Sequence, residues 1–170
     1  MQPSSRSYRC GVLTLSDKGA RGEREDTSGP LIQEMLQGEG YEIAVYQIIP
    51  DQQGLIEQTL MDWVDERQLD LIVTTGGTGV SPRDRTPEAT RAVIELEVPG
   101  LSEAMRQASL HKTIQAVWSR GIAGIRKGCL ILNLPGSRKA AQENLATVLP
   151  ALAHGLEKLK GSDADCGRLE

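Results

Sequence analysis

The stretch LIVTTGGTG, residues 71–79, joins a short apolar run to a loop of glycine and threonine. Apolar and β-branched residues in a run of this length predict a buried strand. Glycines directly after the strand let the backbone adopt positive φ and approach a ligand closely. The amides of such a loop, together with the hydroxyls of Thr75 and Thr78, can point at an anion. Because ligands in open α/β sheets lie at the carboxyl ends of strands, we expect a phosphate-binding loop here.

This loop matches neither of two well-known nucleotide-binding fingerprints. It lacks the Gly-Lys-Ser or Gly-Lys-Thr of a Walker loop, and no G-x-G-x-x-G follows the strand. Glycine-rich segments also serve as tight connections between elements. A plain turn that binds no ligand therefore stays open as the alternative interpretation.

Four apolar runs alternate with segments of helical periodicity along the chain. Strands are predicted at residues 8–15, 41–49, 69–74 and 129–134. Helices are predicted to begin near Gly29-Pro30, at Asp51 and at Thr86, where Thr86 serves as a cap before Pro87. Another helix is predicted at 101–110, after a break at Pro99-Gly100. A last helix is predicted in the C-terminal region, where Pro150 kinks or restarts it. Residues 117–127 suggest a hairpin. The alternation predicts an α/β fold, a three-layer sandwich with a mostly parallel central sheet and helices on both faces.

The composition limits both size and function. A chain of 170 residues suits a single domain, here with a core of about 8–161 and a flexible tail at 162–170. Aromatic residues make up only 3% and Phe is absent, so base-stacking platforms are not expected. The net charge of -4 provides no general basic field. We therefore expect no nucleic-acid partner, and any phosphate site must be local.

The cysteines and histidines argue against disulfide or zinc chemistry. Cys10 and Cys129 lie in apolar strand-like runs, which predicts buried reduced thiols, and Cys166 lies in the polar tail. The two histidines lack ligand-like neighbours, so no zinc site is expected. The sequence shows no apolar signal core and no run of membrane-spanning length. We expect a cytoplasmic protein that does not contact membranes.

Polar loops follow all four predicted strands, and parallel strands deliver such loops to one edge of a sheet. The loops cover residues 16–22, 50–51, 75–85 and 133–137. Asp51 and Asp84 stand in two of them, and Mg²⁺ binds through one or two carboxylates plus substrate phosphates. Two other interpretations remain: Asp51 as a helix N-cap, and Asp84 as a surface partner of Arg83 or Arg85.

Basic side chains lie beside the same loops, and they suit phosphate contacts. They are Arg83, Arg85, Arg138 and Lys139. A solvated surface charge is the simpler interpretation of each. His111 with Lys112 suggests a polar rim or a helix C-terminus.

Eight separated motifs, taken together, resemble one known family. They are LTLSDKG at 13–19, EDTSGP at 25–30, IPD at 49–51, TTGGTG at 74–79, RDRTPE at 83–88, PGLSEAMR at 99–106, SRGIAGIR at 119–126 and NLPGS at 133–137. In this order they resemble the molybdopterin adenylyltransferases of the Mog type, which are similar to the gephyrin G domain. The match runs from about residue 9 to residue 161.

The resemblance implies a homotrimer that transfers AMP from ATP to the molybdopterin phosphate, releases pyrophosphate and uses Mg²⁺. A separate molybdenum-insertion protein is an implied partner. Asp51 and Asp84 match the family's functional aspartates and are the predicted catalytic residues and Mg²⁺ ligands. Ligand-binding residues are predicted at Ser16, Asp17, Thr75, Gly76, Gly77, Thr78, Gly79, Ser81, Asn133, Pro135, Gly136 and Ser137, and pterin contacts at Ser109, Ser119 or Arg120.

Three other functions compete with this interpretation. The first is a carrier or scaffold that holds molybdopterin without adenylylating it. The second is another nucleotide-using enzyme, such as a pyrophosphatase of related fold. The third is a purely structural trimer. Intact Asp51 and Asp84 argue against the carrier, and the glycine loop argues against the structural trimer.

Overall fold

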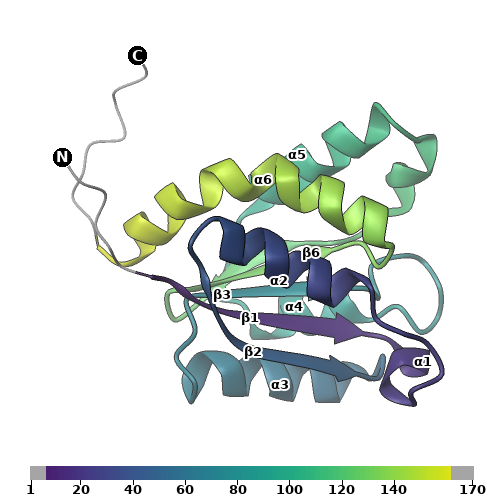
Figure 1. Cartoon of the computed structure of the whole chain (residues 1–170), viewed down its shortest axis with the longest axis horizontal. Coiled ribbons are helices and arrows are strands. Elements are labelled where there is room, and N and C mark those ends of the chain that lie inside the picture. Colours follow the sequence, from purple (N-terminus) through teal and green to yellow (C-terminus); the bar gives the residue numbers. More distant parts are fainter. Residues whose placement is uncertain (1–6, 162–170) are drawn as a thin grey trace.

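A six-stranded sheet runs through the centre of the molecule in the computed structural model, which describes residues 7–161 (Figure 1). The strands are β1 (Arg9–Leu15), β2 (Glu42–Ile49), β3 (Leu71–Thr75), β4 (Leu96–Glu97), β5 (Ala123–Arg126) and β6 (Cys129–Leu134), in the order β2-β1-β3-β6-β5-β4. Pairing is parallel from β2 to β6 and antiparallel at β5 and β4. The predicted mostly parallel sheet is confirmed.

Helices cover both faces of this sheet, which confirms the predicted three layers. They are α1 (Asp17–Ala20), α2 (Ser28–Gly38), α3 (Gln53–Asp65), α4 (Thr86–Val93), α5 (Pro99–Leu110), the 3₁₀ helix η1 (Ile114–Trp118) and α6 (Arg138–Leu159). Helices α2, α5 and α6 pack on one face, and α3 and α4 pack on the other (Figure 1). Every crossover between parallel strands therefore buries at least one apolar helix face.

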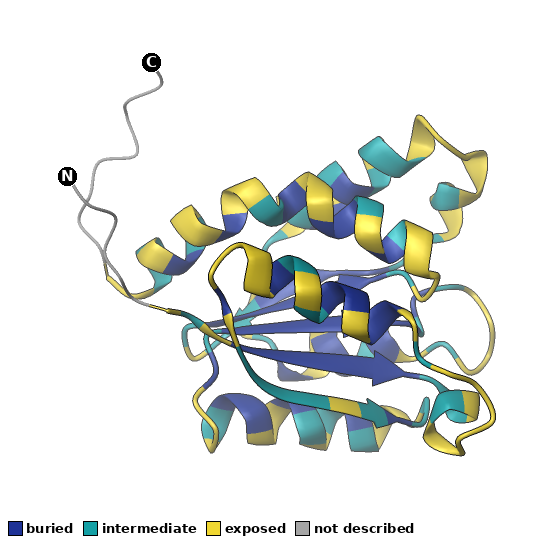
Figure 2. Ribbon diagram, in the orientation of Figure 1, coloured by how far each residue is buried: buried dark blue, intermediate teal, exposed yellow. Residues whose placement is uncertain are grey.

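Alternate residues of each strand supply the two halves of the core. In β1, Val12 packs with α2 and α6, whereas its neighbour Leu13 packs with α3. Both side chains have no exposed area, and strands β3 and β6 are buried along their whole length (Figure 2). Cys10 and Cys129 lie in these strands as buried free thiols, as predicted, and burial raises the pKa of Cys129 to about 12. Cys166 and the predicted tail lie outside the described residues.

Three predicted features near the strand ends are wrong in detail. Residues 17–20 form the short helix α1, because the Ser16 hydroxyl accepts the Gly19 amide at 2.9 Å. Asp51 does not cap α3, which begins two residues later at Gln53. Thr86 is not a cap either: Arg85 is the N-cap of α4, and the Thr86 hydroxyl donates to the Gly76 carbonyl at 2.9 Å.

The C-terminal half also departs from prediction. The hairpin lies later than expected and is formed by β5 and β6, while η1 occupies part of the predicted range. Pro99 starts α5 instead of breaking a helix, since its missing amide proton is not needed in a first turn. Helix α6 continues through Pro150 without a restart. Among residues 7–161, no helix combines the length and the hydropathy that crossing a bilayer requires.

Candidate functional site

A cavity of about 570 Å³ opens at the carboxyl edge of the sheet. Its walls come from the residues after β1, β2 and β3, from segment 24–28 and from segment 136–138. From the central pair β1 and β3, the strand order runs outward in opposite directions, to β2 on one side and to β6 on the other. Open α/β sheets bind ligands at such a switch point, so the topology itself places a ligand site here.

The glycine loop forms one wall, and its backbone requires glycine. Gly76 and Gly77 have φ of 98° and 67°. A Cβ on Gly76 would collide with the Leu15 carbonyl, and one on Gly77 would collide with the Thr86 hydroxyl. The loop is thus fixed against β1 and α4 by contacts that only hydrogen at Cα allows.

Two of the groups expected to face an anion are used inside the protein. The Thr75 hydroxyl donates to the Pro135 carbonyl at 2.7 Å, and the Gly76 amide donates to the Leu134 carbonyl at 3.2 Å. These bonds join the loop after β3 to the loop after β6. In the described part of the chain, the amides of Gly77, Thr78 and Gly79 have no hydrogen-bond acceptor. They are the amides available to a phosphate, and that of Gly77 lines the cavity.

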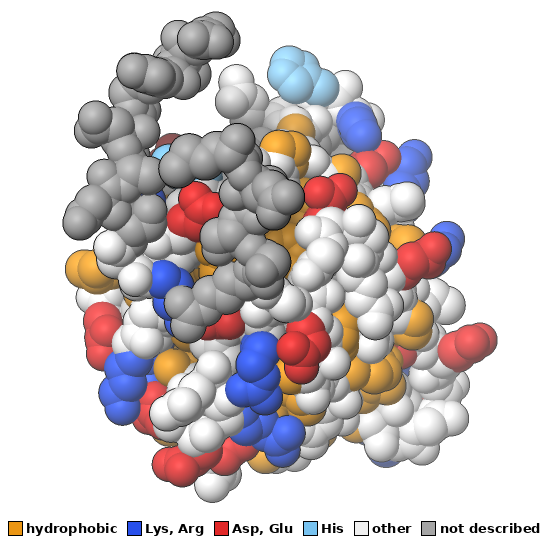
Figure 3. All heavy atoms as spheres, turned by 60° about the vertical axis from the view of Figure 1, so that its left-hand side comes forward, with side chains coloured by type: hydrophobic (Ala, Val, Ile, Leu, Met, Phe, Trp, Pro, Cys, Tyr) orange, Lys and Arg blue, Asp and Glu red, His pale blue; other side chains and the backbone are white. Residues whose placement is uncertain are grey.

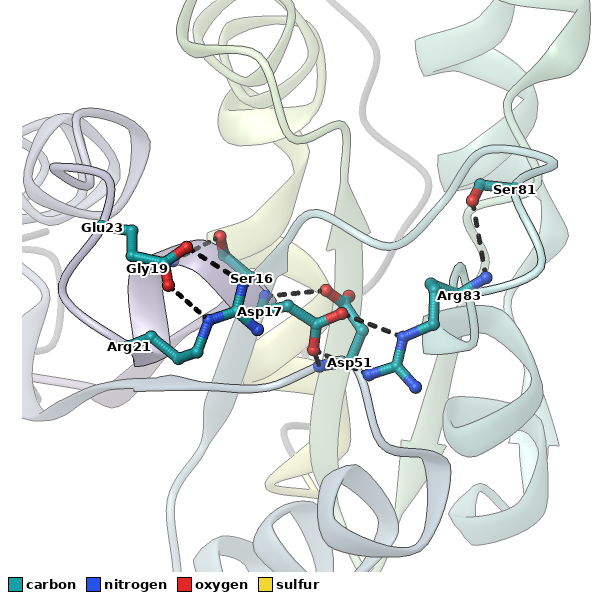
Figure 4. Close-up of polar contacts among 8 residues, drawn as sticks. All are labelled: Ser16, Asp17, Gly19, Arg21, Glu23, Asp51, Ser81 and Arg83. Atoms are coloured by element: carbon teal, nitrogen blue, oxygen red, sulfur yellow. Dashed lines mark hydrogen bonds and ion pairs between the residues drawn. The ribbon is translucent and has the colours of Figure 1, made fainter.

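Asp17 and Asp51 hold each other through reciprocal hydrogen bonds (Figure 4). The Asp17 amide donates to Asp51 Oδ2 at 3.1 Å, and the Asp51 amide donates to Asp17 Oδ1 at 3.0 Å. Arg83 donates to both Asp17 oxygens, at 2.9 and 2.8 Å. Asp17 therefore orients Asp51 and holds the loop that carries Arg83 against the loop after β1. Only a ligand contact was predicted for Asp17.

The electrostatic surroundings of these two carboxyls differ. Burial raises the pKa of Asp51 and the neighbouring Asp17 and Asp84 carboxylates raise it further, while the Asp17 amide and the nearby Arg83 charge oppose the shift. The hydrogen bond from Arg83 lowers the pKa of Asp17. Among residues 7–161, no lysine or arginine forms an ion pair with Asp51. Within the fold, its charge is therefore compensated only in part, by the Asp17 amide and by Arg83 at longer range.

Asp84 lies in the loop between Gly79 and α4 and also has no basic partner among the described residues. Its Oδ2 accepts the Ser81 amide at 2.9 Å, and a Cβ on Gly79 would lie 2.9 Å from the same oxygen. The alternative that Asp84 pairs with Arg83 or Arg85 is wrong, because Arg83 binds Asp17 instead and no ion pair joins Arg85 to Asp84 among the described residues. The close approach of Gly79 keeps the carboxylate against the loop backbone.

A further carboxylate in the cavity wall, Asp26, was missed at the sequence level. It accepts hydrogen bonds from the hydroxyls of Thr14 and Tyr46 and from the amides of Ser28 and Gly29. Burial alone would raise the pKa of Asp26, but these four bonds outweigh it and lower the pKa. The signal available in the sequence was an aspartate just before a Ser-Gly-Pro helix start, which is typical of a cap.

The predicted ligand-binding residues divide into two groups. Those that line the cavity are Ser16, Asp17, Asp51, Thr75, Gly76, Gly77, Asp84, Gly136 and Ser137. The others are Thr78, Gly79, Ser81, Asn133 and Pro135. Asn133 is buried, and its amide bonds to Ile122, Thr74 and Thr90, so it supports the core rather than the cavity wall.

A smaller cavity of about 220 Å³ lies beside the first, behind the loop after β6. Pro135 lines it together with Ser109 and Ser119, two of the three residues suggested for pterin contacts. The third, Arg120, lines neither cavity. In the described residues, no group of three or more histidine, cysteine or acidic side chains is arranged to hold a metal by itself.

Known proteins resemble this chain in both sequence and structure. The family described as "Probable molybdopterin binding domain" matches residues 11–154. A molybdopterin adenylyltransferase of Helicobacter pylori (strain ATCC 700392 / 26695) is 44% identical over 158 residues, covering 89% of this chain and 88% of that protein. The Drosophila melanogaster molybdenum cofactor synthesis protein cinnamon is 43% identical over 95% of this chain, but the chain spans only 27% of that longer protein.

A solved structure has the same fold. The molybdopterin biosynthesis enzyme MoaB from Thermus thermophilus superposes with a TM-score of 0.86 at 54% identity, covering 91% of this chain and 98% of that one. The family match covers most of the chain, and it includes the glycine loop and both unpaired aspartates. The chain therefore belongs to the family of probable molybdopterin binding domains.

Proposed function

We propose that the protein is a molybdopterin adenylyltransferase of molybdenum cofactor biosynthesis, acting as a single domain with its site at the carboxyl edge of the sheet. The observation that carries the proposal is the pair Asp51 and Asp84, which have no basic partner among the described residues and share a cavity of about 570 Å³ with the glycine loop. Relatives at 43–44% identity that are named molybdopterin adenylyltransferases support the same activity. A structural protein has no need for unpaired, partly buried charge, which is costly to maintain.

The transfer needs little covalent help from the protein. A phosphate oxygen of molybdopterin attacks the α-phosphorus of ATP and forms a new P–O–P bond. The bond from the α-phosphorus to the bridging β-oxygen breaks, and pyrophosphate leaves with that electron pair. Because the nucleophile is already an anion, catalysis depends on alignment and charge neutralisation. The free amides of Gly77–Gly79 and the serines Ser16 and Ser137 are the groups we assign to phosphate contacts.

Mg²⁺ is the cation we propose for this site. Acidic residues outnumber basic ones in the cavity wall, where Asp17, Glu25, Asp26, Asp51 and Asp84 face Lys18, Arg24 and Arg138. An ATP polyanion needs added positive charge there. Mg²⁺ binds through one or two carboxylates plus substrate phosphates, so Asp51 and Asp84 fit it without a cage made only of protein. When bound, the cation neutralises charge that develops on the phosphates.

We also propose a homotrimer that works in the cytoplasm and passes its product to a molybdenum-insertion protein. Three apolar side chains of η1 are unusually exposed for a monomer: Ile114 at 70%, Val117 at 54% and Trp118 at 59%. Apolar surface of this kind is typical of contacts between proteins. The buried reduced thiols Cys10 and Cys129 suit a reducing compartment.

A product assay tests the proposed activity. Purified protein is incubated with molybdopterin, Mg²⁺ and ATP labelled at the α-phosphate, and labelled adenylylated molybdopterin is separated from ATP. We expect product and pyrophosphate from the wild type, and little product from Asp84→Asn, which keeps the hydrogen-bond acceptor for Ser81 but removes the charge. Binding of molybdopterin should be similar in both proteins.

Two results would overturn the proposal. Tight molybdopterin binding without labelled product from the wild type would favour the carrier. Pyrophosphate or phosphate release that does not require molybdopterin would favour a different nucleotide-using enzyme.

A further inference from the structure

We propose that Arg120 is a positioning residue that acts through Asp84, holding the loop 79–84 in the shape that the transfer requires. The inference rests on the proposed function and adds a residue to it. Arg120 lines neither cavity, so a direct ligand contact does not explain its placement. All its recorded side-chain contacts instead reach one segment, from Gly79 to Glu88.

The guanidinium joins the two ends of the loop. Its Nε donates to the Gly79 carbonyl at 2.7 Å, and its Nη2 donates to the Asp84 carbonyl at 3.0 Å. The Arg120 backbone amide adds a bond to the Thr78 carbonyl at 2.9 Å. Five donors in a rigid plane allow one arginine to bridge acceptors that a lysine cannot reach together.

Glu88 holds the guanidinium in this orientation. Its Oε1 pairs with Arg120 Nη1, and the hydrogen bond from Arg120 lowers the pKa of Glu88. The other carboxylate oxygen, Oε2, is buried without a hydrogen-bond partner in the described structure. The Glu88 side chain is 30% exposed, so the arginine compensates a partly buried charge and the pair favours a single arrangement.

The loop has few bonds of its own to replace these contacts. Within it, the Asp84 amide donates to the Ser81 carbonyl at 2.9 Å, and the Ser81 amide donates back to Asp84 Oδ2 at 2.9 Å. Val80, within this loop, is 61% exposed and therefore packs little. The position of the Asp84 carboxylate relative to Asp51 thus depends on Arg120 from one side and on the Arg83–Asp17 pair from the other.

Arg120→Lys tests the proposal against a matched control, Arg126→Lys. Arg126 also binds a carboxylate, Asp65, through two nitrogens and donates to the Val93 carbonyl, but it lies at the opposite edge of the sheet. We expect Arg120→Lys to lower kcat for AMP transfer by about 100-fold, the size expected from misplacing a reacting group by roughly 1 Å. KM for molybdopterin should stay close to the wild-type value. Arg126→Lys should keep kcat and lower only the unfolding temperature.

A double variant separates positioning from general support. If Arg120 acts through Asp84, then Arg120→Lys combined with Asp84→Asn is no slower than Asp84→Asn alone. Losses that multiply in the double variant, or an unchanged kcat in Arg120→Lys, would overturn the inference. An equal loss of kcat in Arg126→Lys would also overturn it.

Hydrogen exchange of the wild type, Arg120→Lys and Arg126→Lys supplies a readout that does not need activity. We expect faster exchange confined to the peptide covering 78–86 in Arg120→Lys, and wild-type exchange there in Arg126→Lys. Unchanged exchange of this peptide in Arg120→Lys would contradict the loop-holding role. Absence of product from the wild type would instead count against the proposed function, and the exchange result would still decide what Arg120 does.

Discussion

The two edges of the sheet carry polar cavities of similar size, but only the carboxyl edge keeps aspartates, Asp51 and Asp84, that form no ion pair among the described residues. The cavity at the carboxyl edge has a volume of about 570 Å³. A separate cavity at the amino edge has a volume of about 510 Å³. At the amino edge, Asp65 pairs with Arg126 at 2.7 Å and Asp70 pairs with Lys160 at 2.5 Å. Figure 3, which brings that side of the molecule forward, shows acidic and basic side chains lying next to each other.

The pKa shifts of the aspartate carboxyls differ between the two edges in the same way. Hydrogen bonds from Arg126 lower the pKa of Asp65, whereas burial raises the pKa of Asp51 at the carboxyl edge. Charge that is satisfied within the fold contributes to stability. Charge that is kept unsatisfied next to free amides is a functional-site signal, since ligands rather than the protein then complete it. The comparison shows that the ion pairing of the aspartates, more than the polarity or the volume of the cavity, distinguishes the candidate site from the cavity at the amino edge.

Alanine substitution of glycine at each edge gives the largest expected difference. Gly76→Ala introduces a clash with the Leu15 carbonyl at φ of 98°, whereas a Cβ on Gly128, at φ of 76°, would meet only the Leu159 carbonyl oxygen at an ordinary contact distance of 3.9 Å. Backbone strain should cost about 1–3 kcal/mol in both proteins. Only Gly76→Ala should also lose AMP transfer, by about 100-fold or more, because relief of the clash moves the glycine loop (residues 75–79) away from the position in which it contacts a phosphate. Equal kinetic losses in the two variants would remove the distinction between the edges.

Asparagine substitution of one aspartate at each edge should shift stability in opposite directions. A carboxyl with a raised folded-state pKa, such as Asp51, costs stability once pH exceeds its unfolded pKa, so Asp51→Asn should be more stable than wild type at pH 7. Asp65 has a lowered pKa, so Asp65→Asn should be less stable at pH 7, and its deficit should shrink as pH falls.

Denaturant unfolding from pH 3 to pH 8 measures both shifts, and AMP transfer is assayed alongside. Asp51→Asn should lose about 100-fold in turnover despite its added stability, while Asp65→Asn keeps wild-type turnover. Destabilisation of Asp51→Asn at pH 7 would mean that its charge is already compensated by the fold.

Tyr46→Phe has the smallest expected effect and tests whether pairing or location decides the behaviour of a carboxylate. Asp26 lies at the carboxyl edge, yet its charge is satisfied, partly by the Tyr46 hydroxyl at 2.5 Å. Loss of this bond should cost about 1 kcal/mol at neutral pH. Because the pKa of Asp26 is lowered, its stabilisation is lost as pH falls, and Tyr46→Phe should lose it at a higher pH. An unaltered acid unfolding profile would show that the remaining hydrogen-bond donors to Asp26 keep its pKa low without Tyr46.

The sequence predicted the strands well because long-range partners were not needed to recognise them. The apolar runs that became β1 and β6 differ from their predicted bounds by at most one residue. The two-residue strand β4 was not predictable, since both of its residues are exposed and only its pairing with β5 makes it a strand. Capping was misjudged at Asp51, where the side chain binds Asp17 across the sheet edge rather than its own helix.

Part of the site was predictable by position and part was not. Asp51 and Asp84 follow strand ends, so topology alone brought them to one cavity. The roles of Asp26 and Arg120 depend on contacts across long sequence separations, such as Arg120 with Gly79, which no local pattern encodes. Asn133 lies near the end of strand β6 rather than in the predicted loop, and its side chain completes the buried bonds of Thr74 and Thr90.

The most direct test compares two double variants, Asp51→Asn/Asp84→Asn and Asp65→Asn/Asp70→Asn, for AMP transfer and thermal unfolding. Each removes two negative charges from one edge and leaves the side-chain size unchanged. We expect the first variant to lose transfer while its unfolding temperature is unchanged or raised, and the second to keep transfer while its unfolding temperature falls. Retained transfer in the first variant, or a loss of transfer in the second as large as that in the first, would contradict the contrast between the two edges.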